Sequence, residues 1–221
     1  MALNKTLLLC AVALFGFTAS SALAGPLPAD PNALVGYKGA SAFSGTAGAA
    51  TLKASVEYAV YAPGAFATSA ALGFPTDPSG GTQYVYAYEV LNNLGGSSRV
   101  VNLSVSLIPT AAAANVTNNA GTPELGLAPD LSQLIPVAGN PKTNVKWTWT
   151  PTLFTTGLHS DILLFTSPYA PQFLVASMQG GNTTAASSTL PSPVPEPTTL
   201  VLGGSALFGL LAFRSVRRRK V

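Results

Sequence analysis

The sequence predicts an all-β protein whose body is an antiparallel β-sandwich. Three observations support this fold class. Several segments alternate apolar and polar residues with a period of two, turn-forming residues separate those segments, and only the two apolar terminal segments have a helical pattern. We therefore expect roughly seven to nine strands, flanked by an N-terminal signal helix and a C-terminal transmembrane helix.

The strand candidates are short segments in which every second residue is apolar. They lie at 56–62, 83–92, 99–108, 144–150, 161–167 and 172–178. The run Asn92-Asn93-Leu94-Gly95-Gly96 is a turn signal, which predicts a hairpin over 83–107. Residues 109–141 are rich in proline, and they predict either a short strand near 132–137 or a segment that wraps the sandwich.

Residues 1–24 have the three-part layout of a secretory signal peptide. A basic start precedes an almost wholly apolar run, and Ala22 and Ala24 occupy the positions that a signal peptidase accepts. We expect the mature chain to begin near Gly25. Cys10 is the only cysteine and would leave with the signal peptide, so the mature chain should contain no disulfide and no cysteine metal site.

The other end of the chain combines three features in order. A proline-flanked carboxylate occupies Val194-Pro195-Glu196-Pro197, an uncharged apolar segment follows at 198–213, and a basic tail closes the chain at 214–221. We expect the apolar segment to be a short transmembrane helix, which spans roughly 24 Å at ~1.5 Å per residue. The basic side chains should remain in the cytoplasm by the positive-inside rule. They are Arg214, Arg217, Arg218, Arg219 and Lys220.

This arrangement resembles the PEP-CTERM sorting signal of Gram-negative bacteria. The resemblance implies a PEP-CTERM sorting domain-containing protein, a substrate of an exosortase, from a family associated with exopolysaccharide-producing, biofilm- or floc-forming bacteria. It covers about the last 28 residues, 194–221. It implies export, a precursor held transiently in the inner membrane, and a mature form at the cell surface or outside the cell. It assigns no function to the body.

Domain organisation follows from these boundaries. We expect a β-sandwich body at 25–178 and a flexible Ser/Thr/Pro-rich stalk at 179–193, between the signal peptide and the sorting signal. Residues 25–193 carry five basic and seven acidic side chains, a net charge of −2, so the formal +3 of the whole chain comes from its tail. Because the body has no basic stripe with interleaved aromatic residues, we expect no nucleic-acid partner.

No set of residues predicts catalysis, so we expect a protein that is not an enzyme and has no cofactor and no metal site. The only histidine, His159, precedes Ser160 and Asp161, but neighbours along a chain point apart and do not form a triad. Glu57 and Glu89 lie in predicted strands, where we expect them to face solvent rather than to pair as in a glycosidase. A hydrolase is therefore the weakest alternative.

The aromatic residues leave a second alternative open. Tyr84, Tyr86 and Tyr88 share one strand face and are candidates for a platform on which sugar rings stack, although core packing is the favoured interpretation of such a row. Core packing is the favoured interpretation of Trp147 and Trp149. We expect a structural or adhesive surface protein of the extracellular matrix, processed by signal peptidase and exosortase, with exopolysaccharide as a candidate partner. A carbohydrate-binding module is the alternative.

Overall fold

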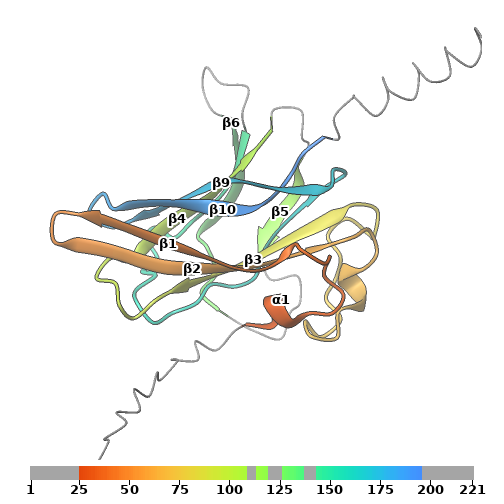
Figure 1. Ribbon diagram of the computed structural model, residues 1–221, viewed down its shortest axis with the longest axis horizontal. Helices are drawn as coiled ribbons and strands as arrows, with labels where there is room; N and C mark the ends of the chain where they lie inside the picture. Colours follow the sequence, from red (N-terminus) through yellow and green to blue (C-terminus); the bar gives the residue numbers. More distant parts are fainter. Residues whose placement is uncertain (1–24, 109–112, 119–125, 137–142, 196–221) are drawn as a thin grey trace, which may run out of the picture.

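The computed structural model describes residues 25–108, 113–118, 126–136 and 143–195. Their structure is all-β, as predicted: two five-stranded antiparallel sheets face each other, with little helix (Figure 1). The expected signal helix and transmembrane helix lie outside the described residues. Within the described residues, no helix has the length and apolar character needed to cross a membrane.

The first sheet, called sheet A here, has the strand order β1-β2-β3-β8-β5. Its strands are β1 (Lys38–Ala47), β2 (Ala50–Tyr61), β3 (Tyr84–Asn92), β8 (Leu163–Ser167) and β5 (Ala114–Asn118). The second, sheet B, has the order β10-β9-β4-β7-β6. Its strands are β10 (Ala185–Pro193), β9 (Pro171–Gly180), β4 (Val100–Leu107), β7 (Thr143–Thr148) and β6 (Leu131–Pro136).

The period-two segments form strands as predicted, but the described residues contain ten strands rather than seven to nine, and one expected pairing is wrong. The sequence predicted a hairpin over 83–107, whereas β3 pairs with β2 and β8 in sheet A, and β4 pairs with β7 and β9 in sheet B. The turn residues after β3 therefore carry the chain from one sheet to the other. The expected short strand near 132–137 is confirmed as β6, which pairs with β7.

The main core lies between the sheets and consists of the inward side chains of both. Trp147 packs against Tyr88 and Phe165, and Tyr86 stacks on Phe165 with ring centroids 4.7 Å apart. Such aromatic contacts add to the free energy gained by removing large rings from water. Because the mature body should lack disulfides, burial of this kind is the main source of its stability.

A second, smaller core covers the outer face of sheet A. The N-terminal segment, with helix α1 (Pro26–Ala29), and the segment that follows β2, with the 3₁₀ helix η1 (Phe66–Thr68), pack on this face (Figure 1). Most outward side chains of β3 and β8, and of the end of β2, are apolar here, so the central part of sheet A is buried on both faces. The buried side chains are Leu27, Ala33, Ala59, Tyr61, Phe66, Leu72, Val85, Ala87, Ile162 and Leu164.

The edge strands of the two sheets meet along one side of the sandwich. β1 of sheet A lies against β10 of sheet B, with the Ser41 hydroxyl donating a hydrogen bond to the Thr189 carbonyl at 2.7 Å. Gly45 lies so close to the Ala185 carbonyl that a Cβ at this position would overlap it. The absence of a side chain at Gly45 thus permits the two edges to close on each other, which protects them from pairing with another chain.

Candidate functional site

The sorting motif begins where the last strand ends. Val194 directly follows β10, is 9% exposed, and donates a backbone hydrogen bond from its nitrogen to the Ala170 carbonyl at 3.0 Å. Pro195 is the last residue that the structure describes. Glu196, Pro197, the apolar segment 198–213 and the basic side chains of the tail lie outside the described residues.

The expected flexible stalk at 179–193 is wrong. The structure places Gln179 and Gly180 at the end of β9 and residues 185–193 in β10, which pairs with β9 in unbroken register from Ala185 to Pro193. The small and hydroxylated residues of this segment suggested a linker, but Leu190 is fully buried in the main core. Two prolines are tolerated because β10 is an edge strand, where one side needs no ladder donors.

The proposed tyrosine platform is also wrong. Tyr86 and Tyr88 are fully buried in the main core, and Tyr84 is half-buried against it. The Tyr86 hydroxyl donates to the Tyr169 carbonyl at 2.8 Å, and the Tyr88 hydroxyl donates to the Pro191 carbonyl. A sugar ring cannot stack on Tyr86 and Tyr88, because both side chains are fully buried. The interpretation of Trp147 and Trp149 as core residues is confirmed, since both are fully buried.

Glu57 and Glu89 form a buried acidic pair, contrary to the prediction that they face solvent. They lie directly opposite each other in the register of β2 and β3, on the outer face of sheet A. Their exposed fractions are only 5% and 2%. The reason is long-range: the N-terminal segment covers this face, and Gly25 sits against the Oε2 atoms of both glutamates.

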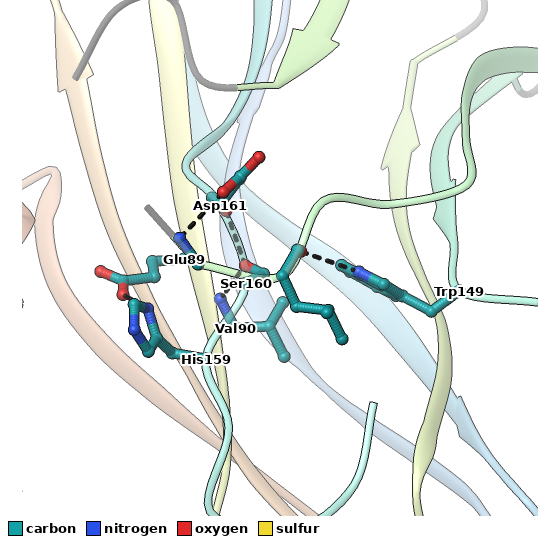
Figure 2. A network of polar contacts seen from close by, with 8 residues as sticks. Glu89, Val90, Trp149, His159, Ser160 and Asp161 are labelled. Carbon is teal, nitrogen blue, oxygen red and sulfur yellow. Dashed lines mark hydrogen bonds and ion pairs between the residues drawn. The ribbon is translucent and has the colours of Figure 1, made fainter. Parts of the chain in front are cut away.

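His159 completes this polar group at its outer rim. Its Nδ1 lies 2.8 Å from Glu89 Oε1, an ion-pair distance when the imidazole is protonated, and its side chain is 43% exposed (Figure 2). Ser160 is buried beside it and has a structural role. Its hydroxyl accepts a hydrogen bond from the Val90 nitrogen at 2.9 Å and donates one to the Asp161 carbonyl at 2.7 Å. Ser160 thus joins β3 to the segment before β8.

Asp161 holds a neighbouring loop in place. Its carboxylate accepts a hydrogen bond from the Gly126 nitrogen at 2.9 Å, and the Leu127 carbonyl accepts one from Trp149 Nε1 at 3.1 Å (Figure 2). Leu127 also forms an isolated parallel bridge with Ser160. These contacts join the loop before β6 to the segment that leads into β8 of sheet A, so Ser160 and Asp161 connect structural elements.

Among the residues that the structure describes, the remaining carboxylates shape turns or join segments. Asp30 is fully buried and accepts hydrogen bonds from the Tyr61 hydroxyl at 2.8 Å and from the Ser69 hydroxyl. Asp130 accepts hydrogen bonds from the Thr152 hydroxyl and nitrogen, and the hydroxyl contact in particular lowers the pKa of Asp130. Within the described residues, no three His, Cys, Asp or Glu side chains are grouped so as to bind a metal ion.

The burial of Glu57 and Glu89 could have been predicted from the apolar residues on both faces of their strands. From Val56 to Tyr61 in β2 and from Tyr84 to Leu91 in β3, the residues on both faces are aliphatic or aromatic apart from Glu57 and Glu89. Strands that are apolar on both faces are typical of sheets covered on both sides. A carboxylate in such a strand is therefore expected to be buried beside a specific partner.

The class of protein follows from the C-terminal segment, which is that of an exported protein anchored in a membrane during its processing. A family model for the PEP-CTERM protein-sorting motif matches residues 193–219. This match confirms the resemblance seen in the sequence: the chain carries a PEP-CTERM sorting motif, which implies processing by an exosortase. None of the curated proteins or solved structures compared with the chain matches it.

Proposed function

We propose that the body is a non-enzymatic structural or adhesive component of an extracellular matrix, delivered there by exosortase processing near residues 194–197. The observation that carries this proposal is the junction between β10 and the sorting motif. Every strand that the structure describes ends before Val194, and the last one is fully paired with β9. Cleavage near 194–197 would therefore release a complete sandwich and remove only the membrane segment.

Two features of the body support a structural role. His159, Ser160, Asp161 and Asp30 make contacts that hold segments of the fold together. Its largest aromatic side chains lie in the cores rather than in a surface binding row. Two edge strands of this disulfide-free sandwich, β1 and β10, cover each other. This arrangement protects the body from aggregation through its sheet edges outside the cell.

Recognition of the motif is expected to depend on the carboxylate of Glu196. Glu196→Gln keeps the size of the side chain and removes its charge, so uncleaved precursor should accumulate in the inner membrane while the body still folds outside. Mass spectrometry of the surface-released protein measures this, because the wild-type chain should end near residues 194–197. Asp130→Asn is the matched control: it makes the same chemical change at an exposed carboxylate of the body and should leave processing intact.

Two outcomes would contradict the proposal. Recovery of wild-type protein that still carries residues 207–221 would show that the C-terminal segment is a permanent anchor. Release of the mature body into the medium, with none retained in the exopolysaccharide fraction, would contradict a role in the matrix without contradicting the sorting step.

A further inference from the structure

The acidic pair has a defined contact with the first residue of the body. A Cβ added to Gly25 would lie 2.7 Å from Glu57 Oε2 and closer still to Glu89 Oε2, distances that real Cβ atoms do not adopt. Both oxygens thus lie within 2.7 Å of one point, so they are no more than about 5.4 Å apart. Gly25 is seated between the two carboxylates, and glycine is the residue that fits there without displacing them.

Two carboxylates at this separation favour a positive charge between them. Like charges repel, and burial withholds the water that would otherwise weaken the repulsion. Buried ionic groups are stable when a partner of opposite sign with good geometry accompanies them. His159 contacts Glu89 from the solvent side, whereas Gly25 approaches both glutamates from the N-terminal segment.

The sequence places a source of positive charge at this residue. Ala22 and Ala24 predict signal-peptidase cleavage after Ala24. In this hydrolysis water adds OH to the Ala24 carbonyl carbon and a proton to the Gly25 nitrogen, which becomes an α-amine. Such amines have a pKa of about 8 and are mostly protonated at neutral pH. The Gly25 nitrogen is within about 5 Å of both Oε2 atoms, because it is two bonds from the Cβ position.

We propose that removal of the signal peptide creates an α-ammonium group at Gly25 that forms an ion pair with Glu57 and Glu89. The pair fastens the N-terminal segment to the outer face of sheet A, where Leu27 and Ala33 complete the second core. Export and folding are thereby coupled: the body reaches full stability only after it has been cut from its signal peptide. The inference rests on cleavage after Ala24 and is independent of the proposed role in the matrix.

The reactivity of the N-terminal amine tests this directly. The full chain is expressed in an exporting bacterial host, and the processed protein is treated at pH 7 with an activated acetyl ester, whose carbonyl carbon only unprotonated amines attack. Acetylation of Gly25 is followed by mass spectrometry of the N-terminal peptide, with the exposed Lys53 as internal reference. We expect Gly25 to react at least ~10-fold more slowly in the folded protein than in urea, the change for a pKa raised by one unit.

Variants distinguish two explanations for a slow reaction of the Gly25 amine: an ion pair with the glutamates, or burial of the terminus alone. Glu57→Gln and Glu89→Gln should each bring the Gly25 rate towards the value in urea, whereas the matched control Asp130→Asn should leave it unchanged. A third variant inserts one serine after Ala24, so that cleavage moves the ammonium by about 3.8 Å and leaves both glutamates in place. This variant should show the fast rate and a lower melting temperature, and it keeps the test decisive if the glutamine variants do not fold.

Three results would overturn the inference. One is a processed chain that does not begin with Gly25. Another is a wild-type Gly25 amine that reacts at the same rate folded and in urea, as expected if the two glutamates share a proton instead. The third is a serine insertion that changes neither the rate nor the melting temperature.

Discussion

At the scale of single residues, the body buries three tyrosine hydroxyl groups and gives each of them a carbonyl or carboxylate partner. The phenols of Tyr61, Tyr86 and Tyr88 donate to Asp30, to the Tyr169 carbonyl and to the Pro191 carbonyl. Burial disfavours the phenolate, so it raises the pKa of each of these tyrosines above the ordinary value of 10.0. These residues act as donors that stay protonated in the folded state.

This burial predicts loss of stability in alkali. A pKa raised in the folded state stabilises the protein fully below pH 10, and the contribution is lost as the pH rises from the unfolded pKa towards the folded one. Above pH 10 the free energy of unfolding should fall by up to about 1.4 kcal/mol per pH unit for each buried tyrosine. Thermal melts from pH 8 to pH 11.5, with tyrosinate absorbance as a second signal, measure this.

Tyr88→Phe provides the comparison for that experiment. It keeps the ring and removes the ionisable group, so its stability curve should fall less steeply above pH 10 than that of the wild type. At neutral pH it should cost about 1 kcal/mol, the typical net value of one hydrogen bond. An alkaline slope identical to that of the wild type would mean that Tyr88 is accessible to solvent.

At the scale of elements, the sequence predicted strands well where apolar and polar residues alternate and poorly where they do not. β4 and β7 were visible because apolar and polar residues alternate along them. β10 was not, because its Ser, Thr and Pro residues resemble a linker and its strand character depends on pairing with β9. The covered face of sheet A was missed for a similar reason, since a period of two does not show which distant segment packs on a strand.

The structure of β10 predicts different costs for two substitutions in the same strand. Leu190→Ala removes a fully buried side chain and should lower the free energy of unfolding by ~2–5 kcal/mol. Ser187→Ala, at an exposed position of β10, should change it by less than about 0.5 kcal/mol. Urea titration of the mature protein measures both. If neither substitution changes the free energy of unfolding, the segment is a flexible stalk and not a strand of the sandwich.

At the scale of the whole molecule, the body is one sandwich with a second core on one side. The fold class and the sorting motif were predictable from the sequence, because both depend on local patterns. The acidic pair and its contact with Gly25 were not, because they unite residues from the N-terminal segment, β2 and β3. The sorting motif could therefore be recognised from a local sequence pattern, whereas the contact of the acidic pair with Gly25 could be recognised only from the tertiary structure.

The whole body should fold without covalent cross-links. The chain has one cysteine, in the predicted signal peptide, so the processed protein should give a β-type far-UV circular dichroism spectrum and a melting temperature that a reducing agent does not change. The precursor, which retains Cys10, is the comparison. A mostly helical spectrum would contradict the two-sheet architecture, and a melting temperature that falls on reduction would contradict a disulfide-free body.

The direct junction between β10 and the sorting motif also has a mechanical consequence. A protein held by its C-terminal end receives any external force at Val194, and that force enters the sandwich through β10. When the pull is directed along the strand, the nine residue pairs between β10 and β9 are loaded in shear and must yield together. The Tyr88 hydroxyl of sheet A donates a hydrogen bond to the Pro191 carbonyl of β10, close to Val194, and so also connects β10 to the opposite sheet. Strand β10, whose sequence resembles a flexible stalk, is thus well placed to resist a force applied at Val194.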